Sequence, residues 1–461
     1  MLKAENNTSL TSPFSQEDLN ALRMQGDPLA DEVIEVFAKQ YGSSINELTE
    51  NLQNMIRMPG NDEMLDVIKK QFPQNEEICT ALEKFFSLAD KAPAWAVAEK
   101  LTLGGHVFQD HMFSGFIMLA CSSLPICYTC IPDVKVLSFT RRLIDKAPKR
   151  IAETAQMITD VMGDGGLNIK NNKLTGKGIQ SILKIRLLHA SIRYLMLNKA
   201  QLIIEHSHEN INDDNFLVAY VLDSIQDKCK WHGTRKPEPW DIKNDNIPIN
   251  GEALALTLLT FSYVILRGLK DIGVRISSEQ QNAYLHSWNV IGYVLGVNEK
   301  MLSEFNTYEK SEVIFNQIMQ RRRGYSEDGE LLQQALLNSF SIIAWKVIPF
   351  PLNRILHVRR LARLITSIMI SKKSYDTLGL KLSLYDRFIR LLVWLGVRFF
   401  GFCVNWGLLR PFADYMFKHI AKSLWDWRDD LSVDTQTTIY KPLVVPHALI
   451  ATSYLADNYK K

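Results

Sequence analysis

A helical stretch with a histidine between two arginines constrains the fold of this chain most strongly. Residues 179–197 contain no glycine or proline. His189 lies beside an apolar stripe, with Arg186 three residues before it and Arg193 four residues after it, so the three side chains occupy neighbouring turns of one helix face. The stripe recurs at helical spacing, at Ile182, Ile185, Leu188, Ile192 and Leu195. The pattern predicts a largely buried helix.

This helix face has two chemical interpretations. A neutral imidazole among aliphatic side chains suits a haem, because the iron needs a nitrogen ligand and the macrocycle needs an apolar slot. Guanidinium groups on the adjacent turns would suit the propionates. The alternative is an ordinary core histidine whose polar atoms are satisfied within the protein. The local pattern leaves both interpretations open.

The remaining sequence predicts an all-α fold. Capping boxes at Ser15–Asp18 and Ser277–Gln280 mark helix starts, and alternating patterns typical of strands are almost absent. A polar loop is expected at 171–178, and one strongly apolar helix at 253–269. We predict a globin-like helical core with additional N- and C-terminal helices. The expected regions are an N-terminal helical region (1–90), the core (91–310) and a basic, aromatic-rich C-terminal helical region (311–461).

Charge and cysteine usage narrow the classes of protein. With 53 basic and 50 acidic residues the net charge is only +3, which argues against a nucleic-acid partner. The Cys127-x-x-Cys130 pair has no second pair and no histidine at zinc-finger spacing, so buried thiols are expected. Residues 1–14 lack the apolar segment of a signal peptide, and we therefore expect a cytoplasmic protein, with peripheral membrane contact as an option.

Residues 321–425 differ in character from the rest of the chain. Arginines and lysines are dense there, and an apolar, aromatic run from Phe388 to Trp406 lies among them. Because Arg390 and Arg398 interrupt the run, we expect a poor membrane span. A basic, aromatic stretch suits the interface of an anionic membrane, whereas a core helix with a solvated basic face would show the same pattern.

Several motifs occur in a fixed order between residues 20 and 300. They are Gly26-Asp27-Pro28-Leu29-Ala30-Asp31, Pro93-Ala94-Trp95 with Gly104-Gly105 and Leu124-Pro125, Arg150-x-x-x-Thr154, Arg186-Leu187-Leu188-His189-Ala190-x-x-Arg193, and Ile247-Pro248-Ile249 with His286-Ser287-Trp288 to Val297. In order and spacing they resemble the family of the latex clearing protein, a haem-dependent rubber oxygenase, and of the ER-bound oxygenase domain of mycophenolic acid biosynthesis. The resemblance implies an all-α fold that binds haem b.

The resemblance also implies roles for individual residues. His189 would be the proximal iron ligand, and Arg186 and Arg193 would be partners of the propionates. Arg150 and Thr154 would line the haem site as the pair needed for activity. Some rubber-cleaving members carry a distal lysine inside the Arg/Thr motif, where this chain has Glu153. Those members also use an acidic base upstream, for which the nearest candidate is Asp133.

These implications lead to an expected function with two alternatives. The first expectation is a haem-dependent oxygenase that uses O2 to oxidise or cleave a C=C bond of a hydrophobic, isoprenoid or unsaturated lipid. Because no export signal is seen, a membrane-dissolved lipid suits the chain better than polymeric rubber. The alternatives are a non-catalytic haem carrier or sensor, membrane-associated or not, and a structural helical protein without cofactor.

Overall fold

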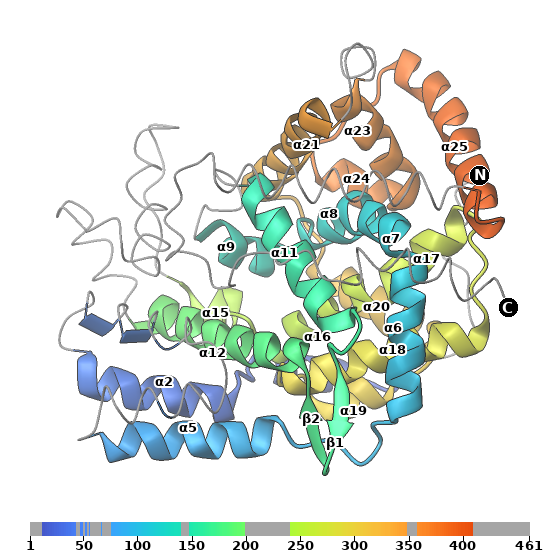
Figure 1. The fold of residues 1–461 in the computed structure, drawn as a ribbon. Helices are drawn as coiled ribbons and strands as arrows, with labels where there is room; N and C mark the ends of the chain where they lie inside the picture. Colours follow the sequence, from blue (N-terminus) through green and yellow to red (C-terminus); the bar gives the residue numbers. More distant parts are fainter. Residues whose placement is uncertain are drawn as a thin grey trace, which may run out of the picture.

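The structure is a computed structural model that describes residues 12–42, 75–139, 147–198, 240–347 and 357–408, with a few further positions between 47 and 66. Its elements are almost all helical. The N-terminal helices are α1 (Gln16–Arg23), α2 (Pro28–Tyr41) and α5 (Glu76–Ala89). The predicted capping box is present, since the Ser15 hydroxyl accepts from the Asp18 amide and the Asp18 carboxylate accepts from the Ser15 amide. Helices α2 and α5 run side by side at the lower left of Figure 1.

The central helices precede and include the predicted histidine helix, α12. In chain order they are α6 (Ala98–Asp110), α7 (Met112–Met118), the π-helical turn η1 (Leu119–Ser123), α8 (Leu124–Cys127), α9 (Ile131–Phe139), α11 (Ala147–Met162) and α12 (Lys177–Asn198). Helix α12 packs against α2, α11 and α18 (Figure 1). Four members of the predicted apolar stripe are buried, and Ile185 is partly exposed. The buried ones are Ile182, Leu188, Ile192 and Leu195.

The loop expected at 171–178 is in part a short antiparallel hairpin. Strands β1 (Asn168–Lys170) and β2 (Lys173–Thr175) pair through a two-residue turn. Both turn residues, Asn171 and Asn172, have positive φ, the conformation that a type I′ hairpin turn requires and that asparagine tolerates. The strands are too short to show an alternating apolar pattern in the sequence.

The apolar segment after residue 250 forms two helices instead of one. They are α16 (Gly251–Phe261) and α17 (Tyr263–Asp271), separated at Ser262. The Ser262 hydroxyl donates to the Leu258 carbonyl at 2.8 Å, a contact that bends helices. The short helix α15 (Ile242–Asp245) precedes these two helices. They are followed by α18 (Ser278–Val294), α19 (Glu299–Ser303) and α20 (Tyr308–Arg322).

The described C-terminal part is also helical. It consists of α21 (Glu327–Val347), α23 (Val358–Met369), α24 (Lys372–Thr377) and α25 (Leu384–Asn405). Helix α25 lies along the upper right edge of the molecule in Figure 1. The Ser383 hydroxyl and the Asp386 carboxylate form a capping box at its start.

Two helical segments of the described residues, 251–271 (α16 with α17) and 384–405 (α25), are long and apolar enough to cross a membrane, and the bent pair 98–110 with 112–127 would make a third. The predicted poor span is thus wrong by this criterion. The two helices differ in burial, because 83% of the first window and only 11% of the second are buried within the protein. The segment 251–271, made of α16 and α17, is therefore part of the core, and α25 is not. The all-α prediction is confirmed.

Candidate functional site

The site is built on α12, which presents His189 between two fixed arginines. Arg186 Nε and Nη2 donate to the two oxygens of Asp27, at 2.6 and 2.8 Å. Arg186 Nη1 donates to the Val294 carbonyl at 3.0 Å. The guanidinium also lies 5.7 Å from the centre of the Phe85 ring. This buried, bidentate arrangement fixes α12 to the start of α2 and to the end of α18.

Arg193 is held in the same way one turn beyond His189. Its Nη1 forms an ion pair with Asp31. Its Nε donates to the Pro248 carbonyl at 3.0 Å, and its Nη2 donates to the Ile249 carbonyl at 2.9 Å. The side chain is 4% exposed, so these groups replace water as its partners. We call Asp27, Asp31, Arg186 and Arg193 the two-acid clamp.

The clamp brings together two motifs that are far apart in the sequence. Asp27 caps α2, since its carboxylate accepts from the Ala30 amide, and Asp31 accepts from the Asp27 amide. Gly296 allows close approach here: it has a φ of +85°, and a Cβ at this position would lie 2.9 Å from Asp27 Oδ2 and 3.0 Å from Arg186 Nη2. A side chain larger than hydrogen would therefore disrupt the pair.

His189 itself is half-buried, and its Nδ1 is buried with no hydrogen-bond partner among the described residues. Burial, and to a smaller degree the positive charge of Arg193, lower the pKa of the imidazole to about 4, against a still smaller opposite effect of Asp27. The ring is therefore neutral at pH 7. Neutral imidazole is the form that binds a metal, and an unpaired buried nitrogen is unusual for a purely structural histidine.

The Pro93-Ala94-Trp95 and His286-Ser287-Trp288 motifs also meet in the structure. His286 Nε2 accepts from the Val97 amide at 3.0 Å, and the Trp95 and His286 rings are 5.8 Å apart, edge to face. A Cβ on Gly104 would lie 2.2 Å from the Ser287 hydroxyl, so α6 and α18 pack with the glycine at their closest contact. These contacts give the two motifs a structural role beside the site.

The Arg/Thr motif lies on α11, which packs against α12. Thr154 is half-buried. The side chains of Arg150 and Glu153 fall outside the described residues, so the assignment of Arg150 and Thr154 to the site stays a prediction.

The predicted cysteine pair lies apart from this motif in the sequence. Cys127 Sγ lies 3.3 Å from the Thr260 hydroxyl, and burial raises the pKa of Cys127 to about 12. Cys130 is fully buried. The prediction of a buried thiol is confirmed for Cys130, whereas Cys127 is only partly buried. In the described part of the chain, no cluster of histidine, cysteine, aspartate and glutamate side chains could hold a metal ion.

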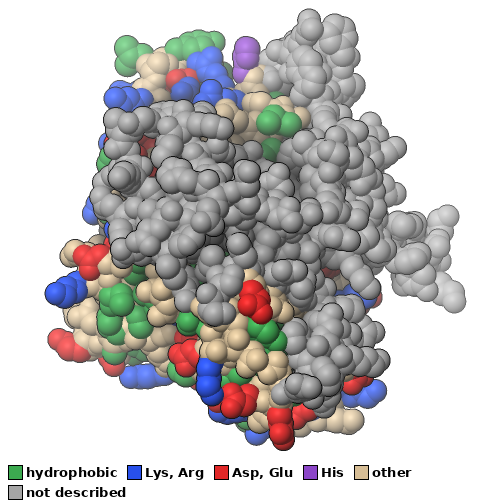
Figure 2. Space-filling view, turned by 90° about the vertical axis from the view of Figure 1, so that its left-hand side faces the viewer, with side chains coloured by type: hydrophobic (Ala, Val, Ile, Leu, Met, Phe, Trp, Pro, Cys, Tyr) green, Lys and Arg blue, Asp and Glu red, His purple; other side chains and the backbone are tan. Residues whose placement is uncertain are grey.

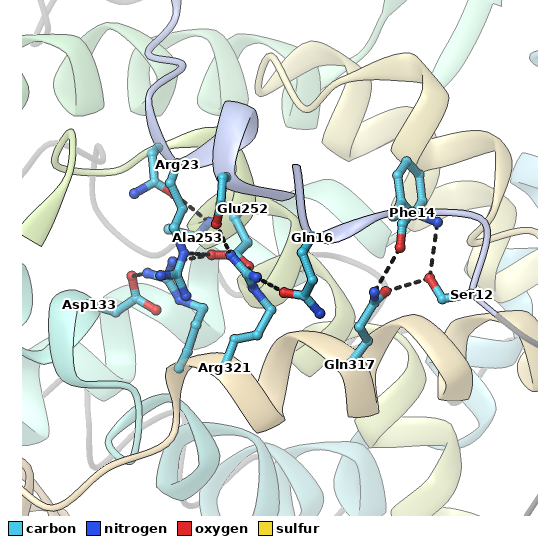
Figure 3. A network of polar contacts seen from close by, with 12 residues as sticks. Ser12, Phe14, Gln16, Arg23, Asp133, Glu252, Ala253, Gln317 and Arg321 are labelled. Carbon is cyan, nitrogen blue, oxygen red and sulfur yellow. Dashed lines mark hydrogen bonds and ion pairs between the residues drawn. The ribbon is translucent and has the colours of Figure 1, made fainter. Parts of the chain in front are cut away.

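Asp133, the candidate base, belongs to a separate charged cluster centred on Glu252 (Figure 3). The Glu252 carboxylate accepts from Arg23 Nε at 2.5 Å, Arg322 Nη1 at 2.7 Å and Arg321 Nε at 3.0 Å. Arg322 Nη2 donates to Asp133 at 2.6 Å. The cluster joins α1, α9, α16 and α20, so Asp133 is engaged in a structural ion pair.

Comparison with known structures defines the class of fold. The chain matches a structure of latex clearing protein in the closed state with a TM-score of 0.56 and 19% identity, over 87% of this chain and 91% of the other. Residues 231–401 match the family model described as "ER-bound oxygenase mpaB/B'/Rubber oxygenase, catalytic domain".

The chain is also similar in sequence to one particular named protein. The chain is 22% identical to the rubber oxygenase of Streptomyces sp. (strain K30) over 280 residues. These aligned residues make up 59% of this chain and 58% of the relative. The alignment therefore spans little more than half of that protein. The family resemblance expected from the motifs is confirmed.

Proposed function

We propose that this protein is a haem b-dependent oxygenase that oxidises or cleaves a C=C bond of a hydrophobic, unsaturated or isoprenoid lipid. The observation that carries the proposal is His189, a neutral, half-buried imidazole with an unpaired Nδ1 on a helix fixed on both sides by the two-acid clamp. The match of residues 231–401 to an oxygenase family supports the reaction class.

The residues present fit a haem. His189 would hold the iron, and the cofactor would supply the activation of O2. Arg186 and Arg193 each donate three of their five N–H groups within the described structure, so each keeps N–H groups with which to bind a propionate. Because the clamp fixes both guanidinium groups, they would be preorganised for that role. Arg150 and Thr154 on α11 would line the site.

A lipid dissolved in a membrane is the substrate class that we propose. Helix α25 exposes many apolar side chains. The peripheral membrane contact predicted for residues 321–425 would bring the protein to such a substrate, and no solubilisation of the lipid would be needed.

Oxygen uptake by the haem-loaded full-length protein tests this function. With vesicles that contain unsaturated or isoprenoid lipids we expect uptake that depends on the lipid, because the double bond is the group that reacts. Vesicles of saturated lipids with the same head group are the control, and His189→Ala protein supplied with haem should consume no oxygen with either. If haem-loaded wild-type protein consumed no oxygen with any unsaturated lipid, the carrier or sensor function would replace the oxygenase.

A further inference from the structure

Helix α25 carries a continuous apolar face that the described residues leave uncovered. Most of the exposed large hydrophobic side chains of the described residues lie between 384 and 408. Six of them, each more than half exposed, recur every three or four residues along one side: Leu384, Phe388, Leu391, Leu395, Phe399 and Phe402. An exposed apolar patch of this kind marks an interaction surface.

The opposite side of α25 contacts the protein at its start, in its middle and at its end. At the start, Asp386 forms ion pairs with Arg360 at 2.7 Å and Arg363 at 2.9 Å, both on α23. In the middle, Arg390 Nη2 donates to the Ser367 carbonyl at 3.0 Å. Val397 and Phe400 pack against the core.

The end of α25 is held by side chains that donate to backbone carbonyls of the turn between α17 and α18. Arg398 Nη1 donates to the Asp271 carbonyl at 3.0 Å, and Asn405 Nδ2 donates to the Gly273 carbonyl at 2.8 Å. A Cβ on Gly401 would lie 2.0 Å from the Ile272 carbonyl oxygen, so the helix and the turn are in direct contact. These contacts attach one side of α25 to the protein, and its apolar side is the one that the described residues leave open to lipid.

The charges around the apolar face are mostly positive. Residues 357–408 contain nine lysines and arginines but only two acidic residues, in a chain that is otherwise nearly balanced. One of the two acids, Asp386, is buried in ion pairs, whereas Arg359, Lys373, Lys381 and Arg387 are exposed. At the upper end of the view in Figure 2, the end that α21, α23 and α25 form in Figure 1, basic and hydrophobic side chains lie together, and acidic ones lie mainly in the lower half.

We propose that α25 lies flat in the interface of an anionic lipid membrane, with its apolar face inserted and its basic neighbours in contact with the head groups. The apolar face supplies the insertion, and the excess of positive charge selects lipids of negative charge. This inference deepens the membrane part of the proposed function, because it names the surface, the lipid class and the orientation. Binding to lipid needs no haem, so it can fail or succeed independently of the oxygenase chemistry.

Vesicle flotation of the full chain tests the surface. Wild-type protein should float with vesicles of equal parts phosphatidylcholine and phosphatidylserine, and should do so weakly with phosphatidylcholine alone or at high salt. The triple variant Phe388→Gln, Leu395→Gln, Phe402→Gln should lose at least about tenfold in bound protein. The matched control replaces Met24, Leu88 and Ile242, which are exposed to a similar degree elsewhere, by Gln. It should bind like wild type.

Several outcomes would overturn the proposal. They are the absence of wild-type binding to anionic vesicles, equal binding to neutral ones, and a triple variant that binds as well as wild type. If sedimentation showed a wild-type dimer that the triple variant loses, with no vesicle binding, the face would be an interface between two copies of the chain. Far-UV circular dichroism identifies a variant that fails to fold, and single variants at the same three positions then provide the test.

The orientation has its own measurement. A fluorophore introduced as a non-natural amino acid at position 388 or 402 is exposed to lipids that carry a quencher at a known depth. The two positions are about 20 Å apart along the helix axis. A flat helix predicts the same shallow depth for both, whereas depths that differ by most of that length would contradict the flat orientation.

Discussion

Replacement of Glu252 by Gln should lower the free energy of unfolding by about 3–5 kcal/mol, because it leaves buried arginines without their counter-charge. The Glu252 side chain is fully buried, as is that of Arg322, and Arg23 and Arg321 contact the same carboxylate. With glutamine there, Asp133 would be the only acid left in the cluster. Urea unfolding at pH 7 measures the effect.

The matched control is Glu77→Gln, which removes an ion pair with Lys39 whose two side chains are at least 70% exposed. It should cost no more than about 0.5 kcal/mol. A Glu252→Gln effect as small as that would mean that the cluster does not stabilise the fold.

The same ion pairs make the stability depend on pH. Burial raises the pKa of Glu252, but Arg322 and Arg23 outweigh this effect and hold the pKa below its usual 4.5. The stabilisation is therefore present above that pH and is lost as the pH falls through the lower folded value.

Replacement of Asp27 by Asn should also lower the free energy of unfolding by about 3–5 kcal/mol, since it leaves Arg186 buried without its bidentate partner. Asparagine is as good a helix cap as aspartate, so the substitution removes the charge and keeps the start of α2. The haem-loaded variant should also lose haem faster, because Arg186 and the helix that carries His189 would no longer be fixed. Urea unfolding and haem transfer to an apo-globin measure the two effects.

Glu32→Gln is the control on the same helix. It removes an exposed ion pair with Lys84, and both the unfolding midpoint and the rate of haem loss should stay close to wild type. An Asp27→Asn protein that unfolds like this control would show that the two-acid clamp contributes little. One that is destabilised but keeps its haem equally well would limit the clamp to a structural role.

The sequence predicted the elements better than their partners. The stripe of α12 and the position of His189 beside it follow from local periodicity, which is a property of neighbouring residues. The pairing of Arg186 and Arg193 with Asp27 and Asp31 joins residues more than 150 positions apart and has no local signal. The sequence shows only the spacing within each pair, because the two acids, and likewise the two arginines, are spaced to share a helix face.

The environment of α25 could not be read from its composition. An apolar run with arginines at 390 and 398 fits a core helix and an interfacial helix equally well. The difference lies in which side of the helix finds a partner, and only the packing of α23 and of the 271–275 turn decides that. In the same way, the break at Ser262 depends on a side-chain bond to the helix backbone that periodicity does not encode.

The absorption spectrum of the purified full-length protein, as isolated and after reduction with dithionite, tests the central claim most directly. We predict a Soret band that shifts on reduction and again with CO, and that is lost in His189→Ala. A spectrum without absorption above 300 nm after haem supplementation, or a His189→Ala protein with an unchanged Soret band, would contradict the assignment of His189 as the haem ligand.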